Sequence, residues 1–514
     1  MPILKRLAEA HRDKVAIRMA DSGEQFTYAE LDARADRVAR WLLSMDLAAG
    51  DVVALLLENH PRSFELWWGV RRAGLYYTPI SVHASADEAA YLLEDCGAKV
   101  LVTSRAQEEV AARVRDRLPA SRRFMLDGAA EGFDAYEDAV AAADPSAVLP
   151  ERPIGREFFY SSGTTGRPKG IRRPMQAFDQ RYEVPALERQ LRSIFRFDAD
   201  TVYLSPSPLY HATSRFIIRA VECGGTAVVM DKFDAEKALE AIDRYRVTHS
   251  HWVPTMMIRM LALPDEVRAR YDVSSMRCAL HAAAPCPPQV KDRMIEWWGP
   301  VIEEYYGGSE NAGVTYIDSR DWQAHRGSVG RPIWGAVHIL GDDGEELPPG
   351  EVGAIYFSGS GDFRYHNDPD KTASAFSRQG WSTYGDMGHV DAEGYLYLSD
   401  RRADLIISGG VNIYPAEIEN ALSLHEAVED VAVIGVPHEE FGQEVKAVVQ
   451  LREPLRPSPE LEQALIEHCR ERISRIKCPR SIDFVDTLPR SENGKLLRRV
   501  LKERYRRRKQ PDTG

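Results

Sequence analysis

The chain has 514 residues, 44% of them hydrophobic and 28% charged, and carries a formal net charge of −12 at pH 7. This length is too great for one hydrophobic core, so at least two domains are expected in an ordinary globular protein. The excess of acidic over basic residues argues against general nucleic-acid binding.

The amino-terminal segment MPILKRLAEAHRDK lacks the apolar core of a signal peptide. No apolar run reaches about 18 residues, the length that spans a bilayer. Six cysteines are scattered without a Cys-x-x-Cys pair, which indicates neither a disulfide framework nor a zinc site. We therefore expect a cytoplasmic protein with reduced thiols and no stable membrane insertion.

The first 400 residues alternate helical and strand-like patterns. Thr27 and Glu30 have the spacing of a capping box ahead of a predicted helix. The apolar runs 52–57, 99–103 and 226–230 are typical of strands buried on both faces. This β-then-α patterning, which continues with a helix at 235–246 and a strand at 247–253, predicts largely parallel sheets covered by helices.

The pattern changes twice in the carboxy-terminal part. From Ile333, strands with tight turns at 342–344 and 392–394 predict a small β subdomain. After SDRRAD, a helix, two strands, a helix, a strand and a final helix predict a small α+β domain. The expected fold is α/β, with an N-terminal domain at 1–400 and a C-terminal domain at 401–514.

A loop rich in serine, threonine and glycine, YSSGTTGRPKG (160–170), is the most informative segment. It is not a Walker loop, because G-x-x-x-x-G-K-[ST] is absent. Its glycines permit close backbone approach to an anion, and its hydroxyls and lysine add donors and positive charge. These residues are Ser161, Ser162, Thr164 and Thr165, the glycines Gly163, Gly166 and Gly170, and Lys169.

Four further segments are suited to binding a nucleotide. In YYGGSE (305–310), Tyr306 offers a flat face to a base, Ser309 a hydroxyl to a phosphate and Glu310 a hard oxygen to magnesium. Asp386 could accept hydrogen bonds from two ribose hydroxyls. Each of these segments, taken alone, is also explained without a ligand, as a turn that caps a helix, a plain turn or a site with a solvated surface lysine. The last two segments are DRRADLIISGGVNIYPAEIE (400–419), which contains Arg401, and PRSENGK (489–495), which ends at Lys495.

In this order and spacing, the five segments resemble the adenylate-forming superfamily of acyl-CoA synthetases, nonribosomal-peptide adenylation domains and firefly luciferase. The resemblance extends from about Ala8 to Arg504. It implies ATP and Mg²⁺ as cofactors, coenzyme A as co-substrate, and a mobile C-terminal domain that carries the catalytic lysine. The ATP site that it implies consists of Ser161, Ser162, Gly163, Thr164, Thr165, Gly166, Lys169, Ala282, Ala283, Ala284, Tyr306, Ser309, Asp386, Arg401 and Lys495.

The resemblance also assigns the remaining roles. The residues implied at the reaction are Lys495, Glu310, Thr164 and His211, of which Glu310 and Thr164 hold the metal; a plain packing role stays open for His211. The implied acyl pocket contains His211, Thr213, Trp252 and Tyr305, and the implied CoA channel contains Ser408, Gly409 and Gly410.

The implied hinge for domain rotation comprises Asp400 and Ala403, where relatives commonly have Asp or Lys at the second position. Alanine can still absorb a change in φ and ψ, but it lacks the polar contacts that hold each conformer. The balance between the two conformers stays open.

The function implied is activation of a carboxylic acid as acyl-AMP, followed by transfer of the acyl group to CoA. The bulky, mostly apolar residues near the expected pocket favour a hydrophobic monocarboxylic acid of the fatty, aromatic or alicyclic class. Transfer to an amine or to a carrier-protein thiol is the main alternative, and a silent adenylate-binding protein or an oxygenase are others. A homodimer is also left open.

Overall fold

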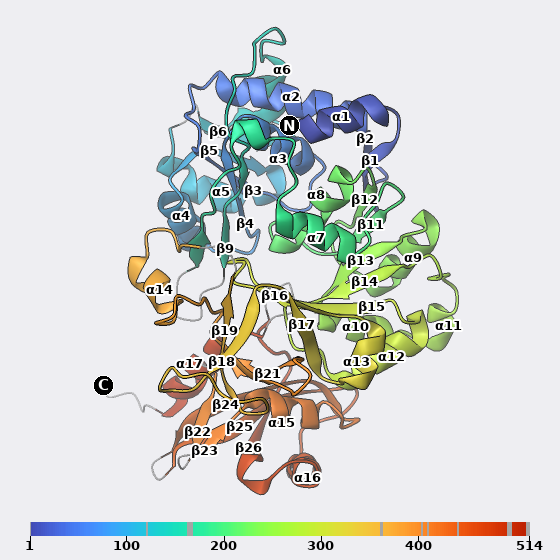
Figure 1. The fold of residues 1–514 in the computed structure, drawn as a ribbon, viewed down its shortest axis with the longest axis vertical. Coiled ribbons are helices and arrows are strands. Elements are labelled where there is room, and N and C mark those ends of the chain that lie inside the picture. The colour runs from blue at the N-terminus through green and yellow to red at the C-terminus, as the bar shows by residue number, and fades with distance from the viewer. Residues whose placement is uncertain are drawn as a thin grey trace. The chain divides into compact units, whose positions relative to one another are not determined.

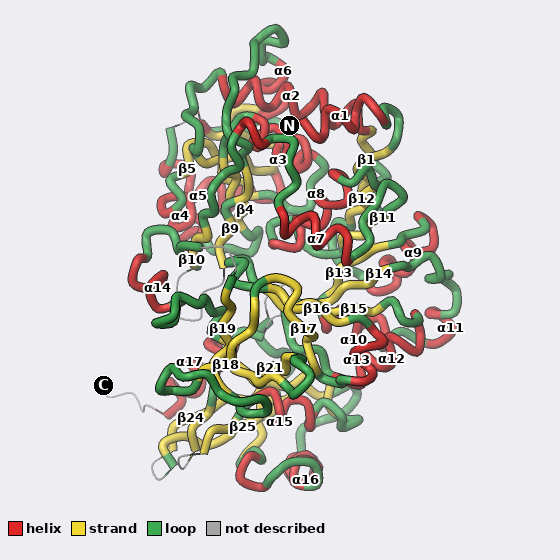
Figure 2. The backbone as a smooth tube through the Cα atoms, viewed as in Figure 1, coloured by secondary structure: helices red, strands yellow, loops and turns green. Residues whose placement is uncertain are grey.

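The computed structural model describes residues 2–119, 122–161, 168–359, 363–401, 404–408, 411–438, 441–490 and 496–509. The chain forms two compact units, whose elements are labelled in Figure 1 and classified in Figure 2. The first unit consists of Met1–Trp252, Arg259–Leu280 and Phe363–Ala373, and the second of Val253–Ile258, His281–Asp362 and Ser374–Gly514.

The first unit contains a six-stranded, fully parallel sheet in the order β7-β6-β5-β3-β4-β8. Every residue of its central strand β3 is buried, because helices cover both faces. The predicted strands at 52–57 and 99–103 are thereby confirmed. The strands are β3 (Val52–Leu56), β4 (Tyr76–Ile80), β5 (Ala98–Ser104), β6 (Arg123–Leu126), β7 (Asp134–Ala135) and β8 (Arg156–Glu157).

A second, mainly parallel group of strands in the first unit runs β2-β1-β12-β11-β13. The helix α2 (Tyr28–Leu43) begins at Thr27, whose hydroxyl accepts from the amide of Glu30 while the Glu30 carboxylate accepts from that of Thr27. The predicted capping box is therefore present. The strands are β1 (Val15–Met19), β2 (Gln25–Thr27), β11 (Val202–Ser205), β12 (Thr226–Val229) and β13 (His249–Trp252).

The second unit contains a run of antiparallel strands, β15-β16-β17-β21-β20-β19-β18. Two tight turns use glycines with positive φ, Gly344 at +85° and Gly394 at +84°, as the predicted DDG and AEG turns require. The strands are β15 (Ile302–Gly307), β16 (Val314–Ile317), β17 (Ser328–Trp334), β18 (Ala336–Leu340), β19 (Gly353–Ser358), β20 (Asp386–Val390) and β21 (Leu396–Arg401).

The carboxy-terminal part of the second unit has a two-faced sheet. Side chains of β24 (Val428–His438) alternate, so that Val431 and Val433 join the core on one face and Ala432 and Ile434 join a smaller cluster on the other. Helices α15 (Pro415–Leu422) and α16 (Pro459–Arg470) contribute to the first core, and α17 (Arg498–Lys509) to the second. The other strands are β22 (Ile406–Ser408), β23 (Val411–Ile413), β25 (Gly442–Leu451) and β26 (Ser481–Val485).

These elements confirm the predicted α/β class. The small α+β region contains the predicted elements in the predicted order, but two further strands, β22 and β23, precede α15. The domain boundary between residues 400 and 401 stays a prediction. No helix in the described ranges is long and apolar enough to cross a membrane. The remaining α-helices are α1 (Pro2–Ala10), α3 (Arg62–Arg72), α4 (Ala86–Asp95), α5 (Glu108–Val114), α6 (Tyr136–Ala141), α7 (Ala186–Ile194), α8 (Arg215–Glu222), α9 (Ala235–Tyr245), α10 (Pro254–Leu261), α11 (Asp265–Arg268), α12 (Pro288–Trp298), α13 (Ser319–Ala324) and α14 (Pro369–Ser374).

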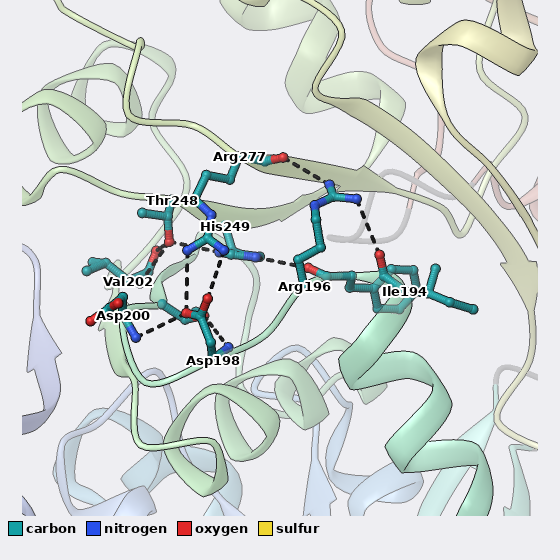
Figure 3. Close-up of polar contacts among 10 residues, drawn as sticks. Ile194, Arg196, Asp198, Asp200, Val202, Thr248, His249 and Arg277 are labelled. Carbon is teal, nitrogen blue, oxygen red and sulfur yellow. Dashed lines mark hydrogen bonds and ion pairs between the residues drawn. The ribbon is translucent and has the colours of Figure 1, made fainter.

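A polar cluster closes the amino-terminal ends of β11 and β13 (Figure 3). Asp198 forms an ion pair with Arg277, with 2.8 Å between the carboxylate and a guanidinium nitrogen. The ring of His249 lies 2.8 Å from the Thr248 hydroxyl and 2.9 Å from the carbonyl oxygen of Phe195. Because these contacts tie loops together at the edge opposite the carboxyl ends of the strands, we assign them to stability.

Three buried histidines make the stability of the fold sensitive to mild acid. Burial lowers the pKa of His249 and of His211 to about 4, and that of His251 to about 3, from 6.5. Below pH 6.5 the unfolded chain binds protons that the folded chain does not, so the unfolded state gains stability as the pH falls. We expect the free energy of unfolding to fall from about pH 6.5 downward, with a slope of up to about 1.4 kcal/mol per pH unit and histidine.

Thermal or urea unfolding at several pH values between about 7.5 and 5 measures this slope, above the range where most carboxylates titrate. His249→Gln removes one of the three titrating groups and should flatten the slope by roughly a third. A slope unchanged by this substitution would contradict the assignment of His249.

Candidate active site

The predicted phosphate loop connects two paired strands of the first unit. Strands β9 (Phe159–Ser161) and β10 (Lys169–Ile171) are antiparallel, with Ser161 opposite Lys169. The Lys169 ammonium lies 5.6 Å from the centre of the Tyr365 ring. The hairpin thus brings both ends of the loop together, while Ser162, Gly163, Thr164, Thr165 and Gly166 lie outside the described residues.

Gly170 has a packing role that the sequence does not reveal. It lies within β10 without a positive φ, and a Cβ atom there would come within 2.8 Å of the Phe158 ring and 2.9 Å of the Tyr160 ring. The Tyr160 hydroxyl in turn donates to the Asp95 carboxylate at 2.5 Å. Glycine is therefore needed here because two aromatic rings occupy the space of a side chain.

A buried carboxylate with three arginines lies just before the hairpin in sequence. Glu157 on β8 accepts hydrogen bonds from Arg173 at 2.6 Å, Arg215 at 2.9 Å and Arg156 at 3.4 Å. Burial alone would raise the pKa of Glu157, but the three guanidinium groups outweigh it and hold the pKa well below its usual range. Three cations against one anion leave positive charge next to the strands that carry the phosphate loop.

A strained alanine marks the loop expected along adenine in the second unit. Residues 282–284 follow β14 (Cys278–His281), and Ala283 has a φ of +73°. The left-handed region costs a non-glycine residue about 1–3 kcal/mol and is typical of functional sites. Ala282 is buried, whereas Ala283 is exposed. The local backbone is thus held in a shape that alanine does not favour.

A buried ion pair lies beside His281, the residue that precedes the loop at 282–284. The Lys291 ammonium, with no exposed surface, lies 2.7 Å from the Glu304 carboxylate, and His281 Nε2 lies 3.5 Å from the same oxygen. Burial raises the pKa of Glu304, and Lys291 counteracts it. The three residues connect α12, the end of β14 and β15. Sequence reasoning missed this cluster because nothing local distinguishes Lys291 from a surface lysine of an amphipathic helix.

The segment YYGGSE forms a tight turn at the end of β15. The amide of Asn311, whose φ is +58°, donates to the carbonyl oxygen of Gly308 at 3.1 Å. A Cβ atom on Gly308 would lie 2.5 Å from the Tyr384 ring and 2.8 Å from the Glu310 carboxylate. Glycine is therefore needed at position 308 chiefly because the Tyr384 ring occupies the space of a side chain. Ser309 and Glu310 are both partly exposed.

Three of the expected nucleotide-binding residues lie together in the second unit. The Tyr306 hydroxyl donates to the Asp386 carboxylate at 2.6 Å. Asp386 on β20 is directly opposite Arg401 on β21 in the antiparallel register. The Tyr384 hydroxyl, two residues before Asp386, bonds to the backbone of Gly313 at 2.8 Å and 3.1 Å. The sequence expectation that Asp386 and Arg401 act together is consistent with this register.

Two expected acyl-pocket residues lie on a loop of the first unit that follows β11. His211 and Thr213 belong to this loop, and the fully buried Trp252 ends the neighbouring strand β13. The Asn59 side chain donates to the carbonyl oxygens of Ser207 at 3.2 Å and Met230 at 2.7 Å, and accepts from the amide of Leu209 at 2.7 Å. Asn59, which the sequence did not single out, therefore fixes the start of this loop.

The fourth expected acyl-pocket residue, Tyr305, lies on β15 in the second unit, opposite Tyr316. In the expected CoA channel, the buried Ser408 ends β22, opposite Val411 of β23 and Gly442 of β25. Of the expected hinge, Asp400 lies on β21 opposite Met387. The expected residues Ala403, Gly409, Gly410 and Lys495 lie outside the described residues.

The described residues on both sides of the segment that ends at Lys495 make specific contacts. Arg490 and Leu496 form an isolated antiparallel bridge, which brings the two ends of the segment together. The Arg490 guanidinium forms two hydrogen bonds of 2.6 Å with the Asp430 carboxylate on β24. On the other side, Arg498 of α17 donates to the Glu419 carboxylate of α15 at 2.6 Å.

Sequence comparison places this chain among nucleotide-dependent enzymes. The AMP-binding enzyme family matches residues 4–365, and the AMP-binding enzyme C-terminal domain matches residues 417–495. The chain is 35% identical over 493 residues to a feruloyl-CoA synthase of Amycolatopsis sp., across 94% of each protein. It is 33% identical over 493 residues to the long-chain-fatty-acid–CoA ligase FadD13 of Mycobacterium tuberculosis, across 94% of this chain and 93% of that protein.

The fold is also shared with solved structures. The ATP-bound crystal structure of MatB from Rhodopseudomonas palustris superposes with a TM-score of 0.82 at 29% identity, across 98% of both chains. The similarity therefore covers both the long amino-terminal part and the small carboxy-terminal part of the chain.

Proposed function

Because the chain belongs to the AMP-binding enzyme family, we propose that it converts a hydrophobic monocarboxylic acid into its CoA thioester through an acyl-AMP intermediate. It is an AMP-forming acyl-CoA ligase that uses ATP, a carboxylic acid and CoA. The observation that carries the proposal is the similarity to CoA ligases along more than nine-tenths of the chain.

In the first step, a carboxylate oxygen attacks the α-phosphorus of ATP. The new bond joins this oxygen to phosphorus, and the bond from the α-phosphorus to the bridging oxygen breaks, which releases pyrophosphate. No base is needed, because the carboxylate is already ionised. The enzyme must instead position two anions and neutralise their charge. We assign this task to the phosphate loop and to Lys495.

In the second step, the sulfur of CoA attacks the acyl carbon, and AMP leaves with the electrons of the broken carbon–oxygen bond. The thiol proton is lost to solvent. We propose that the C-terminal domain rotates about Asp400 and Ala403 between the steps, which withdraws Lys495 and presents Ser408, Gly409 and Gly410 to the pantetheine arm.

We propose that Glu310 and Thr164 hold Mg²⁺, which supplies charge neutralisation for the phosphates. Among the described residues, no group of three or more His, Cys, Asp or Glu side chains is arranged to hold a metal. One carboxylate with phosphate oxygens and water is nevertheless an ordinary Mg²⁺ site. The partly exposed Glu310 carboxylate, in a turn that only glycine at position 308 permits, fits this role.

We expect Tyr306→Phe to raise the KM for ATP roughly tenfold with a smaller effect on kcat, because the ring is kept while Asp386 loses a charge-assisted hydrogen bond that orients it. Initial rates of pyrophosphate release at varied ATP concentration measure this change. Tyr316→Phe is the matched control, because the Tyr316 hydroxyl donates to the Glu303 carboxylate at 2.7 Å on the same pair of strands. An equal rise of KM in both variants would refute the ribose-binding role.

A pyrophosphate-release screen of chemically diverse acids, with ATP and CoA present, tests the function as a whole. Mass spectrometry of the products distinguishes the acceptors. We expect CoA thioesters of hydrophobic acids. Amide formation without a thioester would mean that the acceptor is an amine and not CoA. Acylation of a carrier protein only would mean that the acceptor is the carrier-protein thiol. Absence of pyrophosphate release across a broad panel would overturn the proposal.

We also propose a cytoplasmic location, which the six free cysteines support. A homodimer is our proposal for the assembly, and light scattering of the purified enzyme would decide it. Neither proposal affects the chemistry above.

A further inference from the structure

The loop that follows β11 contains an unusual concentration of buried polar atoms. Within the eight residues from Ser207 to Ser214, five buried side-chain atoms have no hydrogen-bond partner among the described residues. These atoms are Ser207 Oγ, Tyr210 OH, His211 Nε2, Thr213 Oγ1 and Ser214 Oγ.

The neighbouring strand adds a sixth atom. Strands β11 and β13 are parallel, with Leu204 opposite Ser250, so their carboxyl ends lie at the same edge. The hydroxyl of Ser250, which has no exposed surface, also lacks a partner among the described residues. The loop and the adjacent strand thus both contain buried hydroxyl or imidazole groups that have no partner among the described residues.

These unpaired atoms call for an explanation, because buried polar groups in folded proteins almost always have hydrogen-bond partners. Other polar groups of the same loop do have hydrogen-bond partners. Its backbone at Ser207 and Leu209 is hydrogen-bonded to the Asn59 side chain. The start of the loop is therefore held by Asn59, while the five side-chain atoms have no partner among the described residues.

All of the available groups are uncharged. Burial lowers the pKa of His211 to about 4, so its ring is neutral at physiological pH. The nearest arginines in sequence are already paired, Arg215 with Glu157 at 2.9 Å and Arg219 with Glu188 at 2.9 Å. A ligand group beside these atoms would meet uncharged donors and acceptors, and the two arginines nearest in sequence already bind carboxylates.

We propose that the acid activated by this enzyme carries an uncharged oxygen substituent, such as a hydroxyl, ether or ketone, remote from its carboxylate and hydrogen-bonded by the loop Ser207–Ser214. This inference rests on the proposed function and narrows its substrate class. A plain hydrocarbon acid leaves the buried hydroxyls unpaired, and a second carboxylate or an ammonium group is buried among uncharged groups. Sites built to hydrogen-bond a substrate group strongly reject analogues that lack it.

Matched pairs of acids test the proposal with the full-length enzyme. Suitable pairs are 3-phenylpropanoic and 3-(4-hydroxyphenyl)propanoic acid, cyclohexanecarboxylic and 4-oxocyclohexanecarboxylic acid, and a fatty acid with its ω-hydroxy analogue. We expect kcat/KM for pyrophosphate release to be at least about tenfold higher for the oxygen-bearing member of at least one pair. Each pair also receives a third member with a carboxylate in place of the oxygen substituent, which should be the poorest substrate.

Two substitutions assign the preference to the loop. Tyr210→Phe and Thr213→Val each remove one hydroxyl with little change of shape, and at least one should lower the preference ratio about fivefold or more. Tyr77→Phe is the matched control, because the Tyr77 hydroxyl is also buried without a partner among the described residues but lies on β4 in the other sheet. The ratio should be unchanged in this control.

Equal or greater activity with every unsubstituted acid, or preference for the dicarboxylic member, would overturn the inference while leaving the proposed function intact. A preference that survives both loop substitutions would also overturn it. Pyrophosphate release from none of the acids, in this set or in the broad panel, would instead reject the proposed function itself.

Discussion

Lys495→Ala should slow adenylation by at least about 10²-fold, which corresponds to roughly 3 kcal/mol in the activation barrier. The ammonium group is expected to bridge the substrate carboxylate and the α-phosphate, where negative charge accumulates as the two anions approach. Its removal leaves this charge without compensation at the moment of bond formation. ATP–pyrophosphate exchange with a good substrate acid measures the step directly.

The same variant separates the two half-reactions. Thioester formation from supplied acyl-AMP and CoA should be nearly unaffected, because in the proposed mechanism the lysine takes no part after adenylation. Lys99→Ala, at an exposed lysine on β5, is the control for loss of a positive charge and should leave both steps at wild-type rates. An equal loss of both steps in Lys495→Ala would mean that one conformation serves both reactions.

Glu157→Gln should destabilise the first unit by about 3–5 kcal/mol, because it removes the only carboxylate within hydrogen-bonding distance of three guanidinium groups in the described cluster. The substitution keeps the volume of the side chain but leaves like charges facing one another without compensation. Urea denaturation followed by circular dichroism gives the change in the free energy of unfolding.

Glu109→Gln is the matched control for this substitution. Glu109 is largely exposed and is paired with Arg113 on α5, so the same change there should cost less than about 1 kcal/mol. The depressed pKa of Glu157 gives a second check. The contribution of Glu157 is present above the pKa of an unfolded glutamate and is lost only as the pH falls below it, so the difference between wild type and variant should shrink in acid. Equal effects of the two substitutions at neutral pH would contradict the importance of the cluster.

Local sequence signals were sufficient to predict much of the fold. The capping box at Thr27 and the apolar runs of β3, β5 and β12 depend on neighbours within a few residues, and each is present as predicted. The turns at Gly344 and Gly394 were also predictable from the sequence. Such features follow from backbone geometry and periodicity, which are encoded over short stretches.

Contacts between segments that are distant in the sequence could not be predicted from such local signals. The three arginines that surround Glu157 come from β8, from the segment after β10 and from α8, and Lys291 meets Glu304 across two elements. The bond between Tyr306 and Asp386 spans 80 residues. Nothing in a single sequence pairs such residues, because the pairing is created by the tertiary fold.

The residues of the candidate site were predicted from the family resemblance and not from local sequence signals. Tyr306, Asp386 and Arg401 were assigned by resemblance, and their neighbouring positions in the second unit agree with a common ligand. The polar character of the loop around Thr213 was missed, because whether a hydroxyl is paired depends on its surroundings and not on its type.

The double anchoring of the segment before Leu496 has a mechanical consequence. Arg490 is held by Asp430 on β24, and the helix that begins at Arg498 is held by Glu419 on α15. Both flanks of the segment are therefore joined to the packed strands and helices of the carboxy-terminal part. If this part rotates between the two chemical steps, as we propose, both flanks move together with β24 and α15.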